Sequence, residues 1–434
     1  MQDVIRRNFI PMPFWAMDPA IWQAFARALR GEARAVLSCY PFKWAFAHPH
    51  SAQGALEFLQ DIGVDDEGRV SAAGVQEQFA TLPTFESLLR QGCVDWEKAE
   101  VDDTPVDGFR MIPEWEPMAG TLINWPTFYP PLWETFRHMV EAVSHATVFL
   151  RVPEGYLGAA VLAWLGAQGV NLAAVRAVPG PVGDIWARDY SPLYGVNRYT
   201  GEPVVHKLSF AAFHPDYRTH FKSIVDIDDR FAWTEGYKVY RSNIMYDGGY
   251  VVTDGAGTYI MTRRVLWDNA HVPNLYARLE AWLGADRLII VDEEPGDALG
   301  HIGYFKFISP QKMLMGMPDD ENSPRYGYYV KLQKLFVDCG YEVVTLPYVI
   351  GAYRDLPDGT PSVRGLYANS LMMNGRVLVC QYGDDLKEYD AQTVEIYRRE
   401  LPDYDVIPID CSITANGGGG INCTTHEIPA IIKE

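Results

Sequence analysis

The sequence predicts an α/β fold made of repeated units in which a helix leads into a short strand. Stretches with apolar residues at helical spacing are followed five times by a short β-rich run. The predicted pairs are 131–146 with 147–152, 155–169 with 170–178, 273–285 with 287–291, 323–340 with 341–346, and 390–401 with 405–409. A unit of roughly 60 residues that recurs in this way indicates a closed or propeller-like arrangement rather than a doubly wound sheet. In addition, no Gly-x-Gly-x-x-Gly pattern follows a strand and opens a helix, which disfavours a dinucleotide-binding domain.

Two other pairs of segments have the spacing of β-hairpins. Residues 239–246 and 250–262 flank an Asp-Gly-Gly sequence, and residues 366–373 and 376–381 flank an Asn-Gly pair. Asn-Gly is a strong signal for a two-residue turn between antiparallel strands. We therefore expect two hairpins between the helix-to-strand units.

The beginning of the chain differs from the rest in its pattern of apolar and charged residues. Residues 18–29 start with Asp-Pro and continue with apolar residues at helical spacing, which predicts a capped helix. An acidic run over residues 95–107 contains a proline and resembles a linker. These patterns predict a mainly helical extension of unknown role over residues 1–105, followed by a catalytic α/β domain over residues 110–434.

Composition and charge narrow the classes of function. The chain has 434 residues, of which 48% are hydrophobic and 13% aromatic, enough for a large packed core. Lys and Arg number 37 against 56 Asp and Glu, which gives a net charge of −19. Such acidity argues against a nucleic-acid or anionic-membrane partner and favours a cationic small molecule. The sequence leaves open whether the chain forms a homo-oligomer.

The six cysteines lack the paired spacing of a disulfide framework, so most are predicted to be reduced core thiols. The N-terminus has no apolar run typical of a secretion signal, and no stretch of about 18 uncharged apolar residues follows. The expected location is therefore the cytoplasm.

Three short segments concentrate reactive side chains in loops or at strand ends. They are residues 184–192 (DIWARDYSP), residues 300–306 (GHIGYFK), and residues 417–426 (GGGGINCTTH). Glycines before Cys423 allow the backbone to approach closely, so that the sulfur can face a cavity as a nucleophilic thiolate. His301 is a candidate general acid and base. Taken alone, each is equally compatible with a structural role.

Carboxylates in the first segment suggest a site for a planar cation. Asp184 and Asp189 could accept paired N–H bonds from a guanidinium, and Trp186 between them could supply an aromatic wall. Asp189 could instead form a structural ion pair. A zinc site at Cys411, Cys423 and His426 lacks the usual ligand spacing, so no metal is expected.

Taken together, these motifs resemble the agmatine deiminase and Porphyromonas-type peptidylarginine deiminase family of the guanidino-group modifying superfamily. The resemblance starts near residue 113 and extends to residue 434. The matching segments are 113–117 (PEWEP), 124–126 (NWP), 185–192, 247–249 (DGG), 253–255 (TDG), 300–301, 367–369 (YAN), 381–384 (QYGD), and the glycine run that ends in Cys423.

The resemblance implies a pseudo-fivefold α/β propeller, also called a pentein fold, and a hydrolase that needs no cofactor. Cys423 would attack the guanidinium carbon, and His301 would protonate the departing ammonia and then activate water. Asp189 would hold guanidinium nitrogens. Trp186 would pack on the substrate stem, and Asn369 would lie near the substrate.

Two positions depart from the family pattern. The family usually has His-x-Asp, whereas this chain has Gly303 in place of the second carboxylate, and Asn422 stands where a histidine usually precedes the nucleophile. Losing a buried charged contact costs roughly 2 to 5 kcal/mol of binding. Gly303 could leave room for a substituted guanidine, or Asp184 or Asp247 could reach in. Asp247 stands where the family often has Glu.

Three functions therefore stay open. The first is hydrolysis of an agmatine- or arginine-like compound to ammonia and a ureido product. The second is amidino transfer or release of a substituted amine, and the third is a catalytically silent guanidinium-binding protein. A carboxylate-bearing substrate tail would need a cation, and the candidates, each also compatible with a solvated surface position, are Arg218, Lys222, Arg241, Arg354 and Arg364.

Overall fold

The computed structural model describes residues 104–126, 132–152, 156–179, 185–210, 232, 236–295, 300–323, 325–349, 363–416 and 418–430. The helical extension predicted over residues 1–105 lies almost wholly outside these ranges and stays a prediction. No helix within them is long and apolar enough to cross a membrane.

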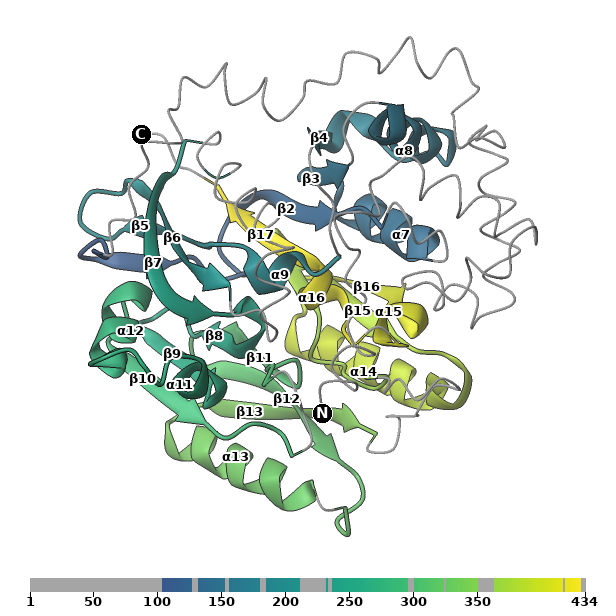
Figure 1. Ribbon diagram of the computed structural model, residues 1–434. Coiled ribbons are helices and arrows are strands. Elements are labelled where there is room, and N and C mark those ends of the chain that lie inside the picture. The colour runs from purple at the N-terminus through teal and green to yellow at the C-terminus, as the bar shows by residue number, and fades with distance from the viewer. Residues whose placement is uncertain are drawn as a thin grey trace, which may run out of the picture.

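The described strands form five separate sheets that share one pairing pattern (Figure 1). In every sheet two strands pair antiparallel, and the second of them pairs parallel with a third. In this order of pairing, the strands are β5 (Leu193–Asn197), β6 (Pro203–Phe210) and β7 (Lys238–Tyr246); β8 (Val251–Thr253), β9 (Thr258–Thr262) and β10 (Arg287–Val291); β11 (Phe305–Ser309), β12 (Lys312–Pro318) and β13 (Glu342–Tyr348); β14 (Leu371–Met373), β15 (Arg376–Gln381) and β16 (Asp405–Asp410); and β17 (Thr425–Pro429), β2 (Met118–Asn124) and β3 (Thr147–Val152).

Where the connection between two parallel strands is described, it contains a helix, because a parallel pair requires a crossover. These helices are α7 (Trp133–Val143) before β3, α11 (Arg264–Asp268) and α12 (Leu275–Leu283) before β10, α13 (Tyr326–Asp338) before β13, and α14 (Lys387–Glu400) before β16. Two sheets carry a fourth strand: β1 (Phe109–Met111) pairs with β5, and β4 (Val175–Pro179) pairs with β3. Helix α8 (Tyr156–Ala167) leads to β4 through a 3₁₀ turn, η5 (Leu172–Ala174).

The five predicted helix-to-strand units are all present, with one difference in their assignment to sheets. The unit predicted at 155–169 and 170–178 does not start a sheet of its own, because β4 adds to the edge of β3. Its strand also begins later than predicted, at Val175, because η5 occupies the preceding residues.

Strand β17 comes from the end of the described chain and pairs with β2 near its beginning. Thr425 lies opposite Ile123, and Thr121 donates a hydrogen bond to the carbonyl of His426, 305 residues away. The pairing places the short helix α16 (Ile421–Thr424), which precedes β17, beside α9 (Ala187–Tyr190) (Figure 1). Three further short helices are η6 (Gly248–Tyr250), η7 (Asp384–Leu386) and α15 (Ser412–Asn416).

Apolar side chains between the helices and the sheets form the core. On α7 the buried residues recur at helical spacing, as in Trp133, Phe136, Met139, Val140 and Val143. The indole of Trp133 packs edge-on against Trp125 and Trp164, with ring centroids 5.0 and 5.3 Å away. Burial of these aromatic rings fixes α7 against the sheet of β2 and β3.

One predicted hairpin is confirmed and the other is wrong. Strands β14 and β15 pair antiparallel across Asn374 and Gly375, which both have positive φ angles, of 47° and 80°. By contrast, β7 pairs with β6 and β8 pairs with β9, so the predicted hairpin around residues 247–249 does not form. Asp247 instead caps η6 by accepting a hydrogen bond from the Gly249 N–H, which carries the chain from one sheet to the next.

The β14–β15 turn provides a test of backbone strain without a steric clash. Gly375→Ala is expected to lower the free energy of unfolding by about 1 kcal/mol, because an L-residue resists this φ while no atom lies within 4 Å of the added Cβ. Gly327→Ala on α13, which also meets no atom within 4 Å, is the matched control and is expected to stabilise by up to about 1 kcal/mol. Urea unfolding measures both, and equal effects would contradict the role of the positive φ.

Candidate active site

Segments distant in sequence meet around a cavity of about 80 Å³. Four of them contribute Arg188 on α9, Cys423 on α16, His301 and Gly303 before β11, and Asn369 before β14. All three segments singled out from the sequence therefore contribute residues to one region. Strand 366–373 was predicted too long: β14 begins at Leu371, and turns before it place Asn369 at the cavity.

The Cys423 sulfur lies at the wall of the cavity and is held by Asn369. The Asn369 Nδ2 donates a hydrogen bond to Sγ at 3.0 Å, and the Cys423 backbone N–H donates to the Asn369 Oδ1 at 3.3 Å. Burial raises the pKa of Cys423 to about 12, and the nearby Asp189 carboxylate adds to the shift. The Asn369 amide acts in the opposite direction, so the thiolate is favoured only when further positive charge approaches.

Glycines next to Cys423 are required by close packing. A Cβ on Gly420 would lie 2.8 Å from the Cys380 Sγ and 3.0 Å from the Asn369 Oδ1. A Cβ on Gly419 would lie 2.5 Å from the Trp186 ring. The glycine run thus allows the close backbone approach that the sequence predicted for this segment.

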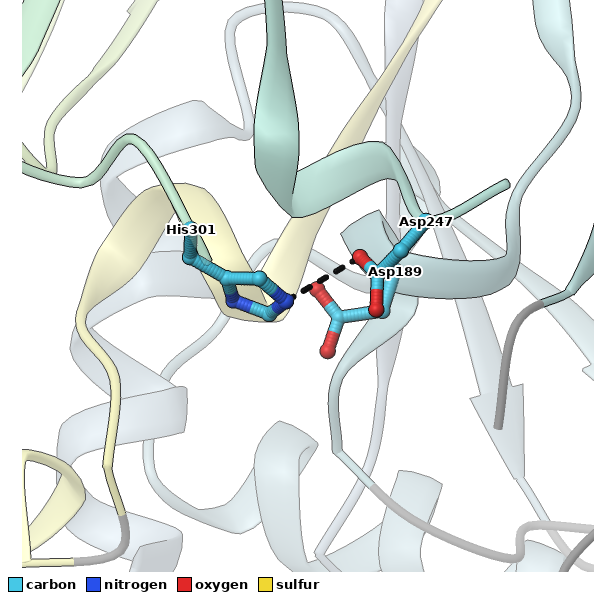
Figure 2. A group of neighbouring side chains, drawn as sticks. All are labelled: Asp189, Asp247 and His301. Carbon is cyan, nitrogen blue, oxygen red and sulfur yellow. Dashed lines mark ion pairs between the residues drawn. The ribbon is translucent and has the colours of Figure 1, made fainter. Parts of the chain in front are cut away.

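Two buried carboxylates, Asp189 and Asp247, lie on the same side of the His301 ring (Figure 2). Its Nε2 is 3.2 Å from the Asp247 Oδ1, and one polar atom from each of Asp189, Asp247 and His301 lies within 4.8 Å of the others. Asp247 therefore contacts the imidazole, whereas the sequence analysis placed it with the substrate. An acidic partner of this kind orients an imidazole and stabilises its charged form.

The ring of His301 packs directly on the backbone of η6. A Cβ on Gly249 would lie 2.6 Å from the ring, and the Ile302 N–H donates to the Gly249 carbonyl at 2.8 Å. The same turn carries Asp247, so one local structure fixes both the imidazole plane and its carboxylate.

One predicted substrate contact, Trp186, does not line the cavity, and a second, Asp184, is not among the described residues. Trp186 is buried at the start of α9 and packs across Gly419, beside the Cβ of Cys423, instead of lining the cavity. The small glycine allows the indole to fill this space. Asp184 lies outside the described residues, and its predicted contact with a guanidinium stays a prediction.

The space at Gly303 is already occupied. A Cβ there would lie 2.9 Å from the Asn369 Nδ2 and 3.4 Å from Leu366. The Asn369 amide therefore occupies the space beside Gly303, and acceptance of a larger guanidine stays a prediction. The absence of a side chain at position 303 lets Asn369 reach the sulfur.

Gly303→Ala is accordingly expected to lower kcat about tenfold, because the methyl group pushes the Asn369 amide away from Sγ. Steady-state kinetics with a guanidino substrate measures the loss. Gly327→Ala, at a glycine that does not line the cavity, serves as the control. An unchanged kcat for Gly303→Ala would show that the Asn369 contact is dispensable.

The raised pKa of Cys423 predicts a steep pH dependence of its reactivity. Because the thiolate is the reactive form, alkylation of Cys423 by iodoacetamide is expected to rise about tenfold per pH unit from about pH 7 to pH 10, with no plateau. Peptide mass spectrometry follows this residue separately from the other cysteines. A rate that levels off below about pH 9 would contradict a thiol held protonated by burial.

Two buried ion pairs beside the cavity were not predicted from the sequence. The Arg188 Nη2 donates to both Glu427 oxygens, at 2.7 and 2.9 Å, and the Lys306 Nζ donates to the Glu114 Oε2 at 2.7 Å. Burial acts to lower the pKa of Arg188, but the nearby Glu427 and Glu114 carboxylates together outweigh it, and the pKa is raised. Arg188 and Glu114 do lie in motifs quoted for the resemblance, which was the available signal.

The other sequence candidates lie elsewhere. His426 contacts the Pro192 carbonyl, and Cys411 lies against Cys380, so the zinc ligand set is not assembled. Within the described ranges, the group with suitable geometry for a cation is Asp189, Asp247 and His301. The prediction that no metal is required stays untested. Arg364 contacts the Tyr382 carbonyl and Asp385, and neither it nor Arg241 lines the cavity.

The fold and the cavity define an α/β protein that presents a thiol, an imidazole and carboxylates together. Residues 110–429 match the profile of the Porphyromonas-type peptidyl-arginine deiminases. The chain belongs to this family and is a hydrolase of the deiminase type, as the sequence predicted.

Relatives of this chain cover the same region. A putative agmatine deiminase of Selenomonas ruminantium is 24% identical over 387 residues, which cover 76% of this chain and 98% of the relative. A putative agmatine deiminase of Vibrio parahaemolyticus is 26% identical and covers 76% of this chain and 100% of its own length.

Solved structures share the fold. Agmatine deiminase of Enterococcus faecalis has a TM-score of 0.63 at 20% identity, with 75% of this chain and 97% of that chain covered. The putative arginine deiminase from Porphyromonas gingivalis has a TM-score of 0.62 at 21% identity, with 74% and 98% covered.

Proposed function

We propose that this chain hydrolyses a small guanidino compound, agmatine- or arginine-like, through a covalent adduct on Cys423. The observation that carries the proposal is the cavity that Cys423, His301 and Asn369 share, with Asp189 and Asp247 beside it. Buried carboxylates favour a guanidinium, and the incoming cation favours the thiolate of a cysteine whose pKa burial has raised. Relatives named as agmatine deiminases support the substrate class.

In the proposed reaction the Cys423 thiol loses its proton to His301, the Sγ forms a bond to the guanidinium carbon, and the pair of electrons of one C=N bond moves to nitrogen. His301 donates a proton to the departing nitrogen as the C–N bond breaks, and ammonia leaves. His301 then takes a proton from water, which adds to the same carbon. The C–S bond breaks last, the hydroxyl proton of the adduct passes to the sulfur, and a ureido product and the free Cys423 thiol are left.

The fold and the domain division are part of the proposal. Five sheets with the same pairing support a pseudo-fivefold α/β propeller over residues 110–434, with residues 1–105 as an extension. A cytoplasmic location and the absence of nucleic-acid and membrane partners stay predictions from the sequence.

Mass spectrometry of the full chain incubated with agmatine, arginine and N-alkylguanidines tests the function. We expect ammonia and one ureido product in equal amounts, and neither with Cys423→Ala. Product formed only when an amine acceptor is added would indicate amidino transfer, and release of a substituted amine would indicate cleavage of the other C–N bond. Ligand-induced thermal stabilisation without any product would indicate a binding protein and overturn the proposal.

A further inference from the structure

Glu114 connects three distant segments at the edge of the cavity. It lies between β1 and β2, and its side chain is only 19% exposed. Its Oε2 accepts hydrogen bonds from the Lys306 Nζ at 2.7 Å and the Met372 N–H at 3.0 Å, and its Oε1 accepts one from the Asn422 Nδ2 at 3.1 Å. Both oxygens are thus engaged, and a substrate cation would have to displace Lys306 to reach the Oε2 atom.

Asn422, the residue before the nucleophile, is held at three points. Its side chain donates to Glu114, its carbonyl accepts from the Arg188 Nε at 3.2 Å, and its N–H donates to the Asn369 carbonyl at 3.4 Å. Helix α16 has four residues, too few to maintain its own geometry. The position of the Cys423 sulfur therefore depends on these contacts from neighbouring segments.

We propose that Glu114 and Asn422 are positioning residues that hold the Cys423 thiol in place through their mutual hydrogen bond. The inference rests on the proposed function for its effect on turnover. The Asn422 amide has no charge of its own to gain or lose, whereas the histidine usual in the family would change its charge near neutrality. The Asn422–Glu114 contact thus joins the residue before the nucleophile to a segment that lies 308 residues away.

Exchanging the donor and the acceptor tests the contact. Asn422→Asp places two acceptors about 3.1 Å apart and is expected to lower kcat and the rate of Cys423 alkylation by iodoacetamide roughly 10- to 100-fold. Adding Glu114→Gln supplies an amide donor opposite the carboxylate introduced at position 422 and restores the original net charge. The double variant is expected to recover most of both losses, because the hydrogen bond returns with reversed polarity.

Two comparisons make the test specific. Asn422→Ala removes the donor without adding charge, so it is expected to slow both reactions and to gain nothing from Glu114→Gln. Glu116→Gln changes a carboxylate two residues away that pairs with Arg110 at 2.6 Å and does not line the cavity, and it is expected to leave both rates within about twofold. Thermal unfolding of each variant identifies any general loss of structure.

A double variant as slow as Asn422→Asp, with wild-type thermal stability, would overturn the positioning role. A rise in the KM of Asn422→Asp with an unchanged rate of Cys423 alkylation would also overturn the positioning role. It would assign Glu114 to substrate binding. Alkylation of Cys423 requires no substrate, so this arm tests the contact even if no guanidino compound is turned over and the proposed function fails.

Discussion

Replacing Cys423 by alanine is expected to lower turnover of a guanidino substrate by at least about 10⁴-fold. The sulfur is the nucleophilic atom on the cavity wall and accepts the hydrogen bond from the Asn369 Nδ2. Without it no covalent adduct forms, and His301 alone cannot replace the attacking atom. Steady-state kinetics and mass spectrometry of the trapped adduct both measure the effect.

The fold should survive this change, so that the loss can be assigned to chemistry. Alanine removes one buried sulfur and is expected to cost about 1 to 2 kcal/mol of stability. Cys339→Ala is the matched control, since Cys339 is a free cysteine that does not line the cavity. Residual turnover of more than a few per cent in Cys423→Ala, with normal turnover in the control, would assign the nucleophile elsewhere.

The second large effect is expected for Asp247→Asn, a loss of about 10³- to 10⁴-fold in kcat. Asp247 is fully buried, and its Oδ1 lies 3.2 Å from the His301 Nε2 while accepting the Gly249 N–H at 2.8 Å. An asparagine can keep its oxygen toward Gly249 but carries no charge to stabilise the imidazolium that forms during the reaction.

Matched variants separate charge from packing in this prediction. Asp247→Glu keeps the charge and introduces the residue common in the family, so it is expected to retain more activity than Asp247→Asn. Asp254→Asn alters another buried carboxylate, which bonds its own turn and Tyr341 away from the cavity, and is expected to reduce stability with little change in kcat. If Asp247→Asn and Asp254→Asn lose kcat equally, Asp247 has only a structural role.

Local sequence patterns predicted the helices and several strands of this fold well. Helix α14 and strands β10 and β15 lie within a few residues of the expected ranges, because apolar periodicity and turn residues are local properties. Strands β2 and β12 were missed, since they are buried runs without alternation, which resemble loops or helix segments by pattern. The false hairpin at residues 247–249 arose because an Asp-Gly-Gly turn also fits a 3₁₀ connection between sheets.

For the candidate site, the sequence identified the reactive residues but not the residues that contact them. Cys423, His301 and Asn369 were singled out and do line one cavity. Asn369 fills the space beside Gly303 across 66 residues of chain (369 − 303 = 66). Arg188 pairs with Glu427 across 239 residues. No local pattern encodes such distances. The packing of Trp186 on a substrate stem stays a prediction.

The pairing of β17 with β2 has a consequence for synthesis of the chain. Thr121 and His426 form a hydrogen bond across 305 residues. At a synthesis rate of ~5 to 20 residues per second, the edge of β2 therefore stays unpaired for roughly 15 to 60 s. During that interval the unpaired strand edge is a template for association with other nascent chains. We expect ribosome-bound fragments that end before β17 to require chaperones and to lack a positioned thiol, so that the reactive cysteine is assembled only with the last strand.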